Sequence, residues 1–122
     1  MIADQRASIN KQTNQLVFDL KRGFLQFVIL HLISQQQRYA YEIKDEILKI
    51  TSGTFDIDRN NLYKKLRSLE QQGFLKSQME HSRRGADRKY YTITPFGKKL
   101  FQEMYQLLIP VMGSLHTRIT KS

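Results

Sequence analysis

The fold is decided by residues 61–75, NLYKKLRSLEQQGFL, which have the pattern of an amphipathic helix followed by a turn and a strand. Leu62, Leu66 and Leu69 recur at steps of four and three, which places them on one face of a helix. We predict this helix over residues 59–72, and the glycine that follows suits the left-handed turn at a helix end. The leucine face would be buried, and the opposite face would be polar and basic.

The residues after this helix predict a β-hairpin and a long final helix. Residues 75–79 alternate apolar and polar, and residues 89–93 are β-branched and aromatic, so both have the pattern of short strands. The connection 82–87 contains two arginines and a glycine and would form a basic tip. Thr94 followed by proline is a typical helix start, and the last helix should extend from Pro95 to about Ile119.

Two helices precede the decisive segment. Apolar residues at helical spacing predict one helix over about 18–34 and another over Ala40–Ile50. Residues 1–17 are mostly polar and are expected to form an N-terminal arm, either mobile or helical only with a partner. The expected fold is mainly α with a small β-hairpin: a winged helix-turn-helix domain over residues 18–94 and a C-terminal dimerisation helix over 95–122.

Composition narrows the class of partner. The chain has 122 residues, enough for one domain, and 20 Lys and Arg against 11 Asp and Glu give a formal charge of +9. Such an excess favours a polyanion, either nucleic acid or an anionic membrane surface. There is no cysteine, no signal-peptide pattern and no apolar run long enough to cross a bilayer. We therefore expect a cytoplasmic protein that associates with the bacterial nucleoid and not with a membrane.

The positive charge is concentrated where this fold would contact DNA. From residue 59 to residue 89 there are nine Lys and Arg against three acidic residues. Asparagine can bond bidentately to adenine and arginine to guanine, whereas lysine more often contacts phosphate. The residues expected to contact double-stranded DNA are Tyr39, Tyr41, Arg59, Asn60, Asn61, Tyr63, Lys64, Lys65, Arg67, Arg83, Arg84, Arg88 and Lys89.

The tyrosines in this set have two possible roles. Tyr63 would either contact a phosphate or fill the interface between helix and sheet. Of Tyr39 and Tyr41, one is expected to pack and the other to bond a phosphate at a helix N-terminus. Tyr90 and Tyr91 must face opposite sides of their strand, so one of them belongs to the core.

The last helix carries an apolar stripe that a domain of this size would not cover alone. We expect a homodimer, because an exposed stripe of this kind is otherwise an aggregation hazard. The alternative is that the helix folds back on its own domain. Pro110 should kink or divide the helix. The residues expected in the dimer interface are Phe18, Phe24, Leu100, Met104, Leu107, Leu108, Val111 and Leu115.

Other function classes have less support. The three histidines are scattered, and no metal-ligand spacing, phosphate-binding glycine loop or activated nucleophile is present, so neither an enzyme nor a cofactor is expected. A winged-helix adaptor that binds protein would not need a basic third helix and wing. An RNA or replication-origin binder stays open on these residues.

Three segments resemble the PadR family of bacterial regulators: RYAYEI at 38–43, the segment 61–75, and RKYYTITPFG at 88–97. The resemblance covers about residues 22–118 in the right order. It implies a winged-helix dimer that usually represses transcription at operators with two-fold symmetry. Many such proteins respond to a small, commonly aromatic, effector bound near the dimer interface. The sequence departs from the family pattern at or near the recognition helix. Ala40 replaces the usual Gly, Asn60 and Asn61 replace small residues, and Lys64 replaces a common Pro. The operator preferences of the family therefore do not transfer to this chain.

Overall fold

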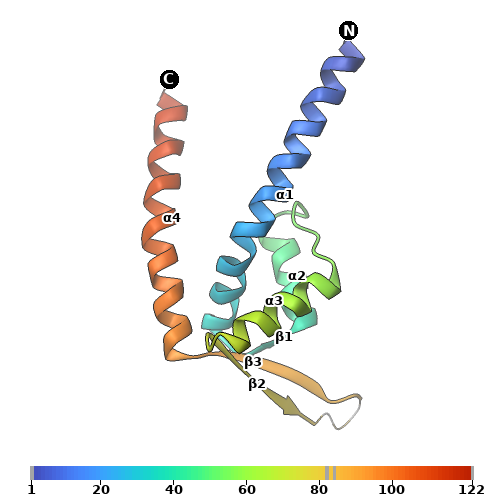
Figure 1. The fold of residues 1–122 in the computed structure, drawn as a ribbon, viewed down its shortest axis with the longest axis vertical. Coiled ribbons are helices and arrows are strands. Elements are labelled where there is room, and N and C mark those ends of the chain that lie inside the picture. The colour runs from blue at the N-terminus through green and yellow to red at the C-terminus, as the bar shows by residue number, and fades with distance from the viewer. Residues whose placement is uncertain (1, 82, 84, 122) are drawn as a thin grey trace.

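The computed structural model describes residues 2–81, 83 and 85–121 (Figure 1). The elements follow the predicted order, with one additional short strand, and confirm a mainly helical fold with a small sheet. They are α1 (Ile2–Gln35), β1 (Arg38–Tyr39), α2 (Ala40–Ile50), α3 (Arg59–Gln71), β2 (Leu75–Glu80), β3 (Arg88–Ile93) and α4 (Pro95–Lys121).

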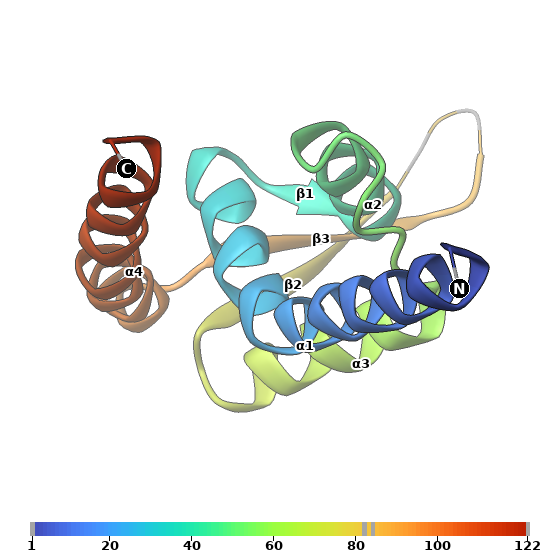
Figure 2. The ribbon, with the colours of Figure 1, turned by 90° about the horizontal axis from the view of Figure 1, so that it is seen from above.

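The core lies between the second half of α1, helices α2 and α3, and the sheet. Ile29 and Leu30 of α1 and Ile43 of α2 are completely buried. The predicted leucine row of α3 is also completely or almost completely buried. Viewed from above, α1 lies over the sheet next to α3, and α4 stands to one side (Figure 2). The apolar periodicity identified the buried face of α3 correctly, whereas in α2 it is right for Ala40, Ile43 and Ile47 but not for Ile50, which is 51% exposed at the end of the helix.

The sheet has three antiparallel strands in the order β1-β3-β2, whereas only the hairpin of β2 and β3 was expected. β1 lies between the helices predicted over about 18–34 and over Ala40–Ile50, and it pairs Tyr39 with Tyr90. Its first residue, Arg38, is buried; its Nε donates to the Leu32 carbonyl at 2.9 Å and so caps the end of α1. A strand of two residues is too short to show any periodicity, which explains why the sequence did not indicate it.

The structure corrects the expected start of α1. The helix is continuous from Ile2, so the residues predicted to form an arm are helical. Residues 2–16 are exposed along their whole length. No proline or glycine interrupts the chain before Gly23, and a helix that is already nucleated extends at little cost per residue. Residues 2–16 are mostly polar, and their few apolar residues are too sparse to predict a helix from the sequence.

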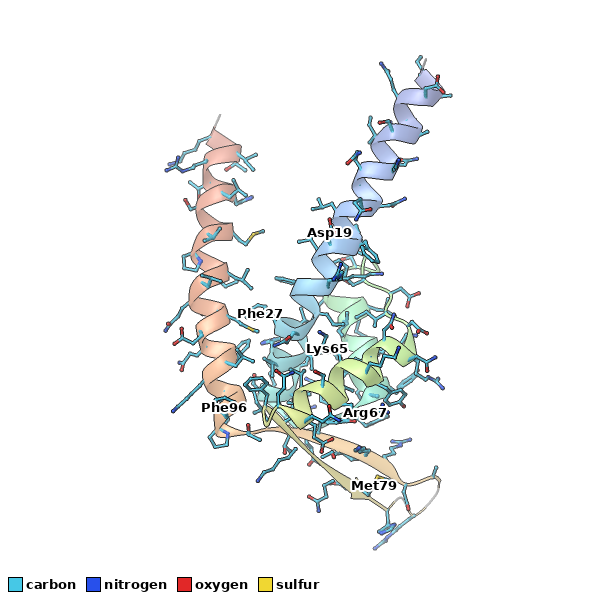
Figure 3. All side chains as sticks on the ribbon, viewed as in Figure 1. Asp19, Phe27, Lys65, Arg67, Met79 and Phe96 are labelled. Carbon is cyan, nitrogen blue, oxygen red and sulfur yellow. The ribbon has the colours of Figure 1, made fainter. Side chains whose placement is uncertain are left out.

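The hairpin extends beyond the body of the domain (Figure 1). Leu75 at its base is buried, but Met79, which the alternation placed on the same side, is 53% exposed. Met79 lies in the outer part of the hairpin, away from the helices (Figure 3). Tyr91 is the buried member of the tyrosine pair, at 4% exposure.

Helix α4 begins as predicted. The Thr94 hydroxyl accepts a hydrogen bond from the Gly97 amide at 3.0 Å and donates to the Gly73 carbonyl at 2.6 Å. It thereby joins the start of α4 to the end of α3, where Gly73 has a φ of +85°. The helix continues through Pro110, so the predicted division is wrong. Proline removes a single amide donor, and the hydrogen bonding on either side of it maintains the helix.

Candidate nucleic-acid interface

The outward row of α3 consists of Asn60, Lys64, Arg67 and Gln71. At 3.6 residues per turn these residues lie opposite the buried leucine row, and all four are exposed. Three of them were expected DNA contacts. Gln71 was not, although its spacing of four from Arg67 could have indicated it. The outward row presents two amides and two cations, which can bond both to base edges and to phosphates.

Asn61 and Lys65 lie on the side of α3 that faces α1. Lys65 is half-buried, whereas Lys64 is exposed, and Figure 3 shows Lys65 towards α1 and Arg67 towards the hairpin. A groove of about 770 Å³ separates α1 from α3. Its lining combines apolar side chains with four cations and two carboxylates: Phe18, Lys21, Arg22, Leu25, Asp56, Ile57, Asp58, Asn61, Lys64, Lys65 and Ser68.

The side of α3 that faces the sheet is attached to the hairpin through Glu70. Its Oε2 accepts a hydrogen bond from the Ser77 hydroxyl, and its Oε1 lies 3.8 Å from the Lys89 ammonium. Burial, and then the negative charge of Glu70, raises the pKa of the Tyr91 hydroxyl above its ordinary value of 10.0. Tyr63 is 43% exposed. Glu70 therefore fixes the recognition helix relative to β2 and β3, and it partly neutralises Lys89.

Aromatic rings and one arginine join the start of α2 to the hairpin. The Tyr39 ring is stacked with that of Tyr41, with centroids 6.4 Å apart, and lies edge-on to that of Tyr90 at 5.4 Å. The Arg88 guanidinium lies 4.5 Å from the centre of the Tyr39 ring. Tyr39 is half-buried and Tyr41 is 69% exposed. Of the two expected roles, packing belongs to Tyr39, and Tyr41 is the ring that faces solvent.

The remaining expected contacts lie at the two ends of this surface. Arg59, the first residue of α3, is exposed, and so is Arg83 at the hairpin tip. Arg84 lies outside the described residues. Close to the tip, His81 Nδ1 is 3.0 Å from Asp87 Oδ1, a contact that spans the two ends of the connection. Cationic side chains thus lie along α3 and along the hairpin.

The residues expected in a dimer interface fall into two groups. Phe24, Leu100 and Met104 are half-buried against the chain's own core. There the Phe27 and Phe101 rings stack with centroids 5.2 Å apart, and Figure 3 shows Phe27 on the side of α1 next to α4. The inner half of α4 therefore folds back on its own domain.

The outer half of α4 remains uncovered. Leu107, Val111 and Leu115 are 70%, 60% and 50% exposed, and Phe18 of α1 is 56% exposed. Leu108 is half-buried. A second hollow of about 410 Å³ lies on α4 itself, between Glu103 and Leu107. The apolar stripe predicted as one surface is thus divided between the core and the exposed face.

Within the described part of the chain, no three His, Asp or Glu side chains are grouped so that they could hold a metal ion. None of the described helices is both long and apolar enough to cross a membrane.

The chain is similar in sequence and fold to a family of transcriptional regulators. The model of the transcriptional regulator PadR-like family matches residues 29–103. An uncharacterised protein X of Lysinibacillus sphaericus is 37% identical over 86 residues, which are 70% of this chain and 79% of that protein. A PadR family transcriptional regulator from Eggerthella lenta superposes with a TM-score of 0.77 at 22% identity, over 95% of this chain and 99% of the other.

A second similar structure is that of Bacillus subtilis PadR in complex with operator DNA. Its TM-score is 0.59 at 24% identity, over 70% of this chain and 47% of the other. The family model covers more than half of the chain, including the end of α1, the whole of α2 and α3, the hairpin and the start of α4. The chain belongs to the PadR-like family of transcriptional regulators, which are not enzymes.

Proposed function

We propose that this regulator binds double-stranded DNA sequence-specifically as a homodimer and represses transcription. Helix α3 lies in the major groove, and the hairpin contacts the backbone or the minor groove. The observation that carries the proposal is the outward row of α3, in which Asn60, Lys64, Arg67 and Gln71 face away from a fully buried leucine row. A helix with one polar, exposed face and one buried, apolar face can enter a DNA groove while its apolar face stays packed on the core.

The side chains of the outward row fit distinct parts of a DNA duplex. Asn60 lies in the first turn of α3, the part of a recognition helix that approaches base edges, and its amide can bond bidentately to adenine. Arg67 can do the same to guanine. The Lys64 ammonium suits a phosphate, and Arg83 at the hairpin tip suits the backbone or a narrow minor groove.

The fold shared with Bacillus subtilis PadR supports this placement, since that protein was crystallised with its operator. The positive charge of this chain supports it as well, because phosphate contacts supply most of the affinity of such proteins. Binding of this kind would place the protein on the nucleoid in the cytoplasm.

The homodimer is supported by the outer half of α4. Its exposed leucines and valine project from the same end of the molecule as the outer half of α1 (Figure 1). A second copy related by a two-fold axis would cover both. It would also place two recognition helices on successive turns of one DNA face, as operators with two-fold symmetry require.

The test measures binding of the purified protein to fragments of its own genome by fluorescence anisotropy, over a salt series and with excess competitor DNA. We expect competitor-resistant complexes on a few fragments, and an affinity that falls steeply with salt. Binding that is equally weak on all fragments and absent at physiological salt would contradict the proposal. That result would favour a winged-helix adaptor that binds another protein.

A further inference from the structure

We propose that Tyr39 is a positioning residue that holds Arg88 in place for a DNA phosphate before DNA arrives. The proposal rests on the proposed DNA binding and adds a role for one aromatic side chain. The two residues belong to different elements, since Tyr39 is in β1 at the start of α2 and Arg88 is the first residue of β3. Their contact, 4.5 Å from guanidinium carbon to ring centre, is within the range of a cation–π interaction.

The Tyr39 ring is held from several directions. The Tyr39 backbone pairs with Tyr90 in the sheet, and the Tyr39 backbone amide donates to Glu42 Oε1 at 3.2 Å. The Tyr90 ring lies edge-on to it, and the Tyr41 ring is stacked with it at an interplanar angle of 16°. Strand pairing, a hydrogen bond and two ring contacts together leave this ring little freedom to move.

Arg88, by contrast, has no acidic partner within 4 Å among the described residues. Glu80 is its cross-strand neighbour, but the Glu80 carboxylate accepts a hydrogen bond from the Gln37 amide at 3.1 Å. The next residue, Lys89, is different because it lies close to Glu70. Among the described residues no carboxylate forms an ion pair with Arg88, so its donors can bond to an external anion.

The chemistry of arginine suits this arrangement. A guanidinium that places its flat face on a ring keeps its N–H donors at the edge, where they can bond bidentately to a phosphate. A long exposed side chain normally loses rotamer freedom when it binds. The ring contact restricts Arg88 in advance, so less of that loss remains at the binding step. The anion that fits is one phosphate of the duplex backbone beside the hairpin.

The experiment is a double-mutant cycle of affinity for a selected genomic fragment, with Tyr39→Leu, Arg88→Ala and the double variant. We expect Tyr39→Leu to weaken binding about three- to tenfold, the effect of losing one cation–π contact. We expect Arg88→Ala to weaken it at least as much and to lower the slope of log affinity against log salt by about one. The double variant should bind the fragment with the same affinity as Arg88→Ala, because Tyr39 acts through Arg88.

Three controls separate this role from a structural one. Tyr39→Phe keeps the ring and should bind within about twofold of the wild type. Arg83→Ala removes another cation of the hairpin, and its effect should multiply with that of Tyr39→Leu. Arg88→Lys keeps the charge without the flat guanidinium and should bind more weakly than wild type even if Tyr39→Leu fails to fold.

Two results would overturn the proposal in different ways. If the wild type binds specific fragments but the effects of Tyr39→Leu and Arg88→Ala simply multiply, then Tyr39 does not position Arg88 and the DNA-binding function stands. Wild-type affinity in Arg88→Lys would have the same meaning. If the wild type binds no fragment specifically, the proposed function fails and this role fails with it.

Discussion

At the scale of single residues, two close contacts fix the elements that would carry DNA contacts. Glu70 attaches α3 to both strands of the hairpin, through Ser77 and Lys89. Gly97, in the first turn of α4, lies against the backbone of Phe74 at the base of the hairpin. The segment TPFG was expected to begin a helix. The structure adds that a glycine is required at position 97 because Phe74 packs too closely for a side chain, which the sequence did not show.

Gly97→Ala should destabilise the fold. A Cβ at this position would overlap the Phe74 carbonyl oxygen and lie 2.8 Å from Ile93 Cγ1, so backbone would have to move. We expect a loss of roughly 1–3 kcal/mol in the free energy of unfolding, measured with urea. Gly113→Ala is the matched control in the same helix, because a Cβ there has nothing within 4 Å. It should raise stability by up to about 1 kcal/mol, and equal effects of the two variants would refute the packing argument.

Tyr91 should lose its proton later than an ordinary tyrosine. Burial first, and then Glu70, raise the pKa of its hydroxyl above 10.0, so the folded state favours the neutral phenol. The resulting contribution to stability is complete below the ordinary pKa and is lost as pH rises through the higher folded value. Ultraviolet absorbance of phenolate should therefore show one delayed step, at higher pH than that of an ordinary tyrosine.

Tyr91→Phe is expected to remove that delayed step, whereas Tyr105→Phe, which removes a half-exposed tyrosine of α4, should leave it in place. A delayed step that persists in Tyr91→Phe would assign it to another group.

At the scale of elements, the two sides of α3 that flank its buried face have different surroundings. On the side next to the sheet, Glu70 accepts a hydrogen bond from the Ser77 hydroxyl, and the side next to α1 lines the groove of about 770 Å³. The outward row lies between these two sides and is exposed, with Lys64 at the edge of the groove. The helix periodicity predicted the buried row, but the division of the polar residues depends on which neighbour covers each side.

Lys64→Ala and Lys65→Ala should therefore differ, although the two lysines are adjacent. Lys64 is exposed in the outward row, and its loss should lower the slope of log affinity against log salt by about one, with a similar loss on every sequence. Lys65 is half-buried towards α1, so its removal should change the slope less. Anisotropy over a salt series measures both. A larger effect of Lys65→Ala would place the DNA on the α1 side of the helix.

At the scale of the whole molecule, the outer halves of α1 and α4 project from the end opposite the hairpin (Figure 1). The α4 part exposes an apolar row at steps of four: Leu107, Val111, Leu115 and Ile119. The α1 part exposes Ile2, Ile9 and Leu16 at steps of seven. Leu107, Val111 and Leu115 stay 70%, 60% and 50% exposed in one copy, and a second copy would cover this apolar face.

The double variant Val111→Glu/Leu115→Glu should be monomeric by light scattering, because two carboxylates would be buried in the proposed interface without partners. Its helical content should stay close to wild type, since the inner half of α4 packs on its own domain through Phe101. Gln106→Glu/Thr117→Glu adds the same number of glutamates to the opposite face of α4 and should remain dimeric. A dimer that survives the first double variant would place the interface elsewhere.

The sequence by itself determined the features that depend on neighbouring residues. The leucine row of α3, the bounds of α2, the Thr94 start of α4 and the basic segment from residue 59 to residue 89 all follow from local spacing and composition, and the structure contains each of them. Helix and strand periodicity is a local property, so a single chain reveals it.

Only the tertiary structure decided the features that join residues far apart in the chain. They include the pairing of β1 with β3, the contact of Tyr39 with Arg88, and the division of the α4 stripe into a covered and an uncovered half. The long exposed part of α1 belongs with them, because its three large apolar residues, seven apart, are too sparse to predict a helix. Each depends on which surfaces meet when the chain folds, and that depends on the packing of the whole core.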